Sequence, residues 1–196
     1  MEITLSNIAH QFAQTVMILT LPNGDTSTVE LDTIRTILED QQSQYKPNGS
    51  YEQVAQIIEE NSMISKLDIL NFWEQVAFGW VVGCTQMGYD SFALHSPHKG
   101  LYALAPAYDL SVTAITNPQS ADSLPLTVNR KSRSVTRTDF ETAMKQSGLR
   151  AKIVNGIFTR FIDALDKWCD IIDSSQLDEE TKTQYKEFLR GRVAGL

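Results

Sequence analysis

Apolar residues recur every three or four positions along most of the chain, the spacing that places them on one face of an α-helix. The clearest case runs from Leu149 to Ile172, where successive apolar residues are four, four, four, four, three and four positions apart. The most apolar helix is predicted over Leu67–Val82, and we expect it to be the centre of the core. Other helices are predicted to begin at Ser50, Thr136 and Asp178. The pattern indicates a mainly helical fold.

Local start and stop signals support these helices. Ser50 with Gln53 forms a capping box, in which a hydroxyl and a side-chain amide satisfy backbone groups at a helix start. Thr136 with Asp139 has the same spacing, and Gly148 is placed to end the helix that they open.

The first 44 residues carry a weaker pattern. A first helix is predicted after Ser6 or Asn7, and a Pro-Asn-Gly-Asp turn would end it. Its apolar side chains fall near one face: Ile8, Phe12, Val16 and Leu19. A second helix is predicted over Val29–Gln42. We therefore expect a helical extension or insertion over residues 1–44 and a principal domain over residues 45–196.

Short stretches of the chain favour β-structure. Apolar residues on both sides of a His-Ser-Pro-His-Lys-Gly segment predict a β-hairpin within Phe92–Leu104. Leu124–Val128 reads as a short strand, followed by a basic loop over Asn129–Ser134. The expected fold class is mainly α, with one small β-hairpin.

Composition narrows the function. With 42% hydrophobic and 21% charged residues the chain is ordinary globular material. A net charge of −7 argues against direct binding of nucleic acid, which needs clustered Lys and Arg. No window approaches the roughly 20 apolar residues of a membrane span. The two cysteines, Cys84 and Cys169, form no metal or disulfide framework, so we expect a cytoplasmic protein.

Two motifs lie between the most apolar helix and residue 110. Residues 82–94 read V-G-C-T-Q-M-G-Y-D-S-F-A-L, and residues 104–110 read L-A-P-A-Y-D-L. They resemble the I-G-N-[TN]-D-x-H-x-K-N-F-[SA]-L and L-[SA]-P-A-Y-D-[LV] motifs of HipA-like serine/threonine kinases from bacterial toxin–antitoxin systems. Weaker likenesses on both sides extend the resemblance over roughly residues 45–192. The resemblance implies a kinase-like, helical C-terminal lobe.

The resemblance also assigns catalytic roles, and most of the expected groups are replaced. Gln86 stands where the family has the Asp that acts as general base, and a neutral amide cannot take that role; its loss typically costs on the order of 10²–10⁴ in rate. Ser91 replaces an Asn that holds metal, and its hydroxyl is a weaker Mg²⁺ ligand. Asp109 retains the acid that carries Mg²⁺ against the phosphates of ATP. Asp90 is a weaker alternative base, four positions beyond the expected acid.

Three functions fit these residues, and whether the chain is an enzyme stays open. The first is an impaired kinase lobe, acting as a pseudokinase or regulatory subunit that binds an N-lobe-like polypeptide or a HipB-like antitoxin. The second is an active kinase that uses ATP and Mg²⁺ together with a separate N-lobe chain, because no G-x-x-x-x-G-K-[ST] motif or other phosphate-covering loop is found here. The third is a helical interaction module.

Simpler roles compete with each candidate. The Asp109 carboxylate could cap a turn. His95 and His98 flank a hairpin turn and lack a third metal ligand, so we expect them to be solvated. Cys84 fits a small packing residue, and the basic cluster over 130–137 fits a solvated loop.

Overall fold

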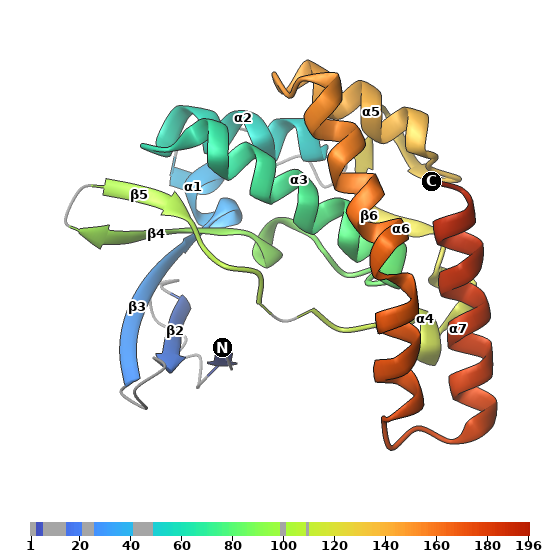
Figure 1. Cartoon of the computed structure of the whole chain (residues 1–196). Coiled ribbons are helices and arrows are strands. Elements are labelled where there is room, and N and C mark those ends of the chain that lie inside the picture. Colours follow the sequence, from blue (N-terminus) through green and yellow to red (C-terminus); the bar gives the residue numbers. More distant parts are fainter. Residues whose placement is uncertain (1–2, 6–14, 21–25, 41–48, 99–100, 109) are drawn as a thin grey trace.

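The computed structural model describes residues 3–5, 15–20, 26–40, 49–98, 101–108 and 110–196. Figure 1 shows a body of helices on one side and a set of strands on the other. The long helices are α2 (Tyr51–Asn61), α3 (Ser65–Val82), α5 (Arg137–Gln146), α6 (Ala151–Asp173) and α7 (Glu179–Ala194). They confirm the helices predicted for residues 50–196.

Helix α3 is central to the core, as its apolar sequence predicted. It packs against α2 and α7, and α6 packs against α7 (Figure 1). Its Phe72 and Trp73 are fully buried, and Phe72 meets the ring of Phe92 edge-on, with 4.9 Å between ring centroids. Two short helices, α1 (Ile34–Asp40) and α4 (Thr113–Thr116), lie outside this central group.

The predicted caps are present, with one change. The Ser50 hydroxyl accepts a hydrogen bond from the Gln53 N–H at 3.1 Å, but the Gln53 side chain accepts from the Tyr89 hydroxyl instead of completing a capping box. Thr136 and Asp139 form the full reciprocal box at the start of α5. The chain leaves α5 through Gly148, which has a φ of +86°.

The helices predicted near the N-terminus are wrong where the structure describes that region. Residues 15–20 and 26–33 form the antiparallel strands β2 (Thr15–Thr20) and β3 (Thr26–Thr33), and only Ile34–Asp40 of the second predicted helix is helical. Both strands are rich in Thr and β-branched residues, which favour extended backbone. Residues 6–14, 21–25 and 41–44 lie outside the described part.

The predicted hairpin is present, but it belongs to a larger sheet. Strands β4 (Ala93–His98) and β5 (Leu101–Leu104) pair antiparallel, and β3 pairs with the other edge of β4. With β1 (Ile3–Leu5), the strand order is β1-β2-β3-β4-β5. This sheet brings residues 31–33 beside residues 93–95, at the end of the first motif.

A second, two-stranded sheet joins β6 (Ser123–Val128) to β7 (Lys131–Arg133). It confirms the strand predicted over residues 124–128 and corrects the basic loop that was predicted after it. Asn129 and Arg130, at φ of +47° and +65°, make the tight turn between the two strands. None of the helices described is both long and apolar enough to span a membrane.

Candidate functional site

The candidate site is the loop that joins α3 to β4, and a glycine fixes where it begins. Helix α3 ends at Gly83, whose φ of +78° is left-handed. A Cβ atom at Gly83 would lie 2.3 Å from the Cβ of Ala114, and the Ala114 N–H donates to the Gly83 carbonyl at 3.0 Å. The loop therefore starts from a point that is packed against α4, where only glycine fits.

Hydrogen bonds from α2 and α4 hold the loop in place. The Tyr51 hydroxyl on α2 donates to the Met87 carbonyl at 2.9 Å, and burial, with a smaller effect of Cys84, raises the pKa of Tyr51 far above its ordinary value. The Thr85 N–H donates to the hydroxyl of Thr113 at 3.0 Å. The loop is thus a fixed feature of the fold.

Two of the predicted site residues lie together. Gln86 is exposed and Ser91 is half-buried, and the Ser91 hydroxyl donates to the Gln86 backbone carbonyl at 3.1 Å. Ser91 sits in a short 3-10 turn, Tyr89–Ser91, in which its N–H donates to the Gly88 carbonyl at 3.1 Å. The proton of the hydroxyl that was expected to hold metal is therefore directed back into the loop.

Asp90, the alternative base, forms an ion pair with Arg35. The Arg35 Nε on α1 lies 2.6 and 2.8 Å from the two carboxylate oxygens of Asp90, and Nη2 lies 2.5 Å from one of them. This bidentate geometry is the strong form of a charge-assisted hydrogen bond. Both oxygens of Asp90 thus face a guanidinium, which is a poor arrangement for taking a proton from a substrate.

Sequence reasoning missed Arg35. It lies in a segment that was predicted to be one long helix of an extension, so nothing placed it near residue 90. The alternation of apolar and polar residues over Val29–Asp32 could have indicated strand β3, but it could not indicate the pairing of β3 with β4 that carries Arg35 to the loop. The Ile34 N–H, directly before Arg35, donates to the Phe92 carbonyl at 3.0 Å.

Asp109 lies outside the described residues, whereas the rest of its motif is described. The Tyr108 hydroxyl donates to the backbone carbonyl of Asp90 at 2.7 Å, and the Ala105 N–H donates to the Ala93 carbonyl at 2.8 Å. The second motif therefore runs beside the first. Of the expected magnesium ligands, the sequence offers one carboxylate, at Asp109, and one neutral hydroxyl, at Ser91, a weak set for a hard cation.

The histidines do not make a metal site with described residues. His95 is half-buried in β4; burial lowers its pKa, and the charge of Asp68 opposes that shift. The side chain of His98 lies outside the described part. Within that part, no group of three or more His, Cys, Asp or Glu side chains is placed to hold a metal ion.

The other candidates have structural roles. Cys84 is 2% exposed and packs in the core. Within the basic cluster, Lys131 donates to the Asp139 carboxylate at 2.9 Å and Arg137 pairs with Glu141 at 2.9 Å. Lys131 is nonetheless exposed, as expected of a solvated loop, whereas Arg137 is half-buried in the first turn of α5.

Comparison with known proteins places these features in a family. The chain matches the HipA-like C-terminal domain over residues 25–169, which includes α1 and the whole of β3. No match was found among curated proteins. The expected division between residues 44 and 45 stays a prediction.

Two solved structures resemble the fold. HipA of Shewanella oneidensis MR-1, in a toxin–antitoxin complex with HipB and operator DNA, aligns with a TM-score of 0.66 at 12% identity, over 98% of this chain and 50% of HipA. The kinase CtkA of Helicobacter pylori, described as proinflammatory, aligns with a TM-score of 0.61 at 15% identity, over 93% and 77%. This chain thus spans about half the length of HipA. Since the family match covers most of the sequence, the chain belongs to the HipA-like C-terminal domain family.

Proposed function

We propose that this protein is a catalytically impaired HipA-type kinase lobe that acts by binding a partner polypeptide. The observation that carries the proposal is the pairing of Asp90 with Arg35 beside a neutral Gln86. A phosphoryl-transfer site needs a carboxylate aimed at the substrate hydroxyl. Here the expected base is an amide, and the nearest carboxylate in the loop faces a guanidinium.

The proposed partner is supported by the resemblance to HipA, which was solved with HipB and operator DNA. We infer that this chain binds a HipB-like antitoxin or an N-lobe-like polypeptide and reaches DNA only through such a partner. The net charge of −7 supports DNA binding by the partner rather than by this chain, because an acidic chain does not neutralise DNA phosphates itself.

One observation favours the rival function, an active serine/threonine kinase completed by a separate N-lobe chain. The bond from Tyr108 to Asp90 keeps the second motif beside the loop, and Asp109 follows directly. In that case Asp109 would hold Mg²⁺ against the phosphates of ATP, and Asp90 would have to give up Arg35 to accept a proton.

Phosphotransfer from radiolabelled ATP in the presence of Mg²⁺ separates the two functions. The chain is assayed alone and with a HipB-like protein or an N-lobe-like polypeptide, as the wild type and as Asp109→Asn. We expect the two forms to transfer phosphate no faster than the protein-free control and to bind the partner with equal affinity in calorimetry. Mg²⁺-dependent transfer that Asp109→Asn abolishes would establish the active kinase instead.

A further inference from the structure

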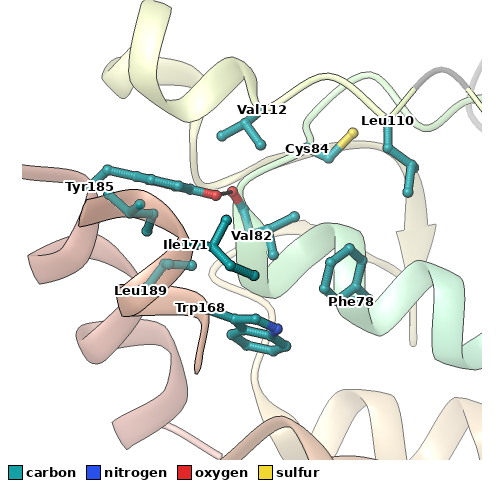
Figure 2. Close-up of a pocket in the computed structure, with 10 residues that line it drawn as sticks. Phe78, Val82, Cys84, Leu110, Val112, Trp168, Ile171, Tyr185 and Leu189 are labelled. Carbon is teal, nitrogen blue, oxygen red and sulfur yellow. Dashed lines mark hydrogen bonds between the residues drawn. The ribbon is translucent and has the colours of Figure 1, made fainter. Parts of the chain in front are cut away.

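A cavity of about 270 Å³ lies away from the Gln86 and Asp90 side chains, between the C-terminal parts of α3 and α6, helix α7 and the segment 110–112. Figure 2 shows side chains from all four converging on it, among them Phe78, Trp168 and Tyr185. Ile171, 65% exposed, and Leu110, 38% exposed, stand at its opening. The cavity is therefore open to solvent at one side and walled by apolar groups on the others.

The uncharged lining of the cavity disfavours ionised ligands. None of the ten residues that line the cavity carries a charge. An ion would lose its hydration there without a counter-charge, which is costly. The Tyr185 hydroxyl donates its proton to the Val82 carbonyl at 3.0 Å, and burial, with a smaller effect of Cys84, raises the pKa of Tyr185 to about 12. Its oxygen is thus neutral and can still accept one hydrogen bond from a ligand.

The volume of the cavity and the aromatic rings in its wall indicate the size and shape of a ligand that would fit. A dry apolar cavity of about 150 Å³ is sufficient for benzene, and drug-sized ligands need about 300 Å³ or more. The value of about 270 Å³ falls between the two and suits a fused pair of rings. Phe78 and Trp168 meet edge to face, with ring centroids 5.6 Å apart and an interplanar angle of 71°. Such walls favour a flat aromatic guest, because aromatic rings prefer edge-to-face or offset contacts.

We propose that this cavity binds a small, neutral, bicyclic aromatic molecule that carries one hydrogen-bond donor. The donor meets the Tyr185 oxygen, and the rings contact Phe78 and Trp168. The site stands independently of catalysis in the loop, although Cys84, Leu110 and Val112 in its wall come from the segments that flank the two motifs.

Calorimetric titration with indole tests the site. We expect saturable binding of one indole per chain, with a dissociation constant below about 1 mM, well within reach of a nine-atom ligand. The heat capacity change should be negative, the mark of buried apolar surface. Indole-3-carboxylate should bind at least about tenfold more weakly, because its charge would be desolvated. Absence of saturable heat, or equal affinity for the two compounds, overturns the proposal.

Two variants of the same helix locate the binding. Ile171→Asp places a charge at the opening and should weaken indole at least about tenfold. Ile162→Asp makes the same change at another exposed isoleucine of α6, 44% exposed and away from the cavity, and should leave the affinity unchanged. Both side chains are exposed, so both variants should retain the wild-type circular dichroism spectrum. An equal effect of the two variants would mean that indole binds elsewhere.

Discussion

At the scale of single residues, Asp139 does more than cap a helix. Its carboxylate accepts hydrogen bonds from Lys131 at 2.9 Å, from the Asn129 side chain at 2.9 Å and from the Thr136 backbone at 3.0 Å, while the residue is 3% exposed. Burial opposes ionisation, but these bonds outweigh it and hold the pKa of Asp139 well below its ordinary value of 3.8. The ionised form therefore stabilises the fold.

Asp139→Asn should lower the free energy of unfolding at pH 7 by about 1–3 kcal/mol, because an amide cannot replace these charge-assisted bonds. A group whose folded pKa is depressed contributes stability above its unfolded pKa and loses it as the pH falls through the folded pKa. The difference in free energy of unfolding between wild type and Asp139→Asn should therefore shrink progressively as the pH falls below about 4. Urea denaturation across this range measures it, and Asp163→Asn, at an exposed aspartate of α6, is the control. A gap that stayed constant down to pH 2 would contradict the assignment.

The Arg35–Asp90 pair gives a second prediction at this scale. Its side chains are 37% and 58% exposed, so solvent screens the pair, and Arg35→Gln should cost less than about 1 kcal/mol of stability. The variant frees Asp90 without removing it. If the loop has lost catalysis, as proposed, phosphotransfer with a HipB-like protein or an N-lobe-like polypeptide should stay at the level of the protein-free control. A gain of activity in Arg35→Gln that Asp90→Asn then removes would show that Asp90 is a latent base.

At the scale of elements, the helices of residues 50–196 could be predicted because their signals are local. Ser50, the Thr136 and Asp139 pair and Gly148 mark helix ends within a few residues of the chain they organise. The strands near the N-terminus depend on distant partners: Leu31 pairs with His95. Val16 and Leu19 fit a helical spacing equally well in isolation, so periodicity alone could not decide.

The contrast between local signals and distant pairing also explains what sequence reasoning missed at the candidate site. Gln86, Asp90 and Ser91 lie within six residues, so the motif alone placed them together. The ion pair of Asp90 requires α1, which reaches the loop only because β3 joins the sheet beside β4. Pairing across the sheet is a tertiary property, and no local pattern near residue 35 encodes it.

The packing of the C-terminal end of α3 against α4 can be tested with two glycine substitutions, which should change the stability in opposite directions. Gly83→Ala should cost about 2–5 kcal/mol, since alanine at a φ of +78° is strained and its Cβ would lie 2.3 Å from Ala114. Gly156→Ala, in the interior of α6 with its nearest neighbour 3.8 Å away, should gain about 0.5–1 kcal/mol. Thermal and urea unfolding of both variants give the comparison. Equal, small effects would mean that the α3 terminus is not pinned against α4.

At the scale of the whole molecule, the question is whether this lobe holds nucleotide by itself. The chain aligns with half of HipA, and of the expected magnesium ligands it retains only the carboxylate of Asp109, while the hydroxyl of Ser91 replaces an Asn. A ligand at about 100 times its dissociation constant adds about 2.7 kcal/mol to the folded state, whereas one at its dissociation constant adds only about 0.4 kcal/mol. Thermal unfolding therefore discriminates well between tight and negligible binding.

We expect millimolar ATP with excess Mg²⁺ to change the melting temperature of wild type and Asp109→Asn equally, by the small amount that salt alone produces. The physical reason is that one carboxylate and one hydroxyl, whose proton points at the Gln86 carbonyl, cannot fix a metal–phosphate complex. Measurements with Mg²⁺ alone and with ATP plus a chelator correct for ionic strength. A rise in melting temperature that needs both ATP and Mg²⁺ and disappears in Asp109→Asn would show that the second motif still holds a metal ion, and the lobe would then be a nucleotide-binding subunit.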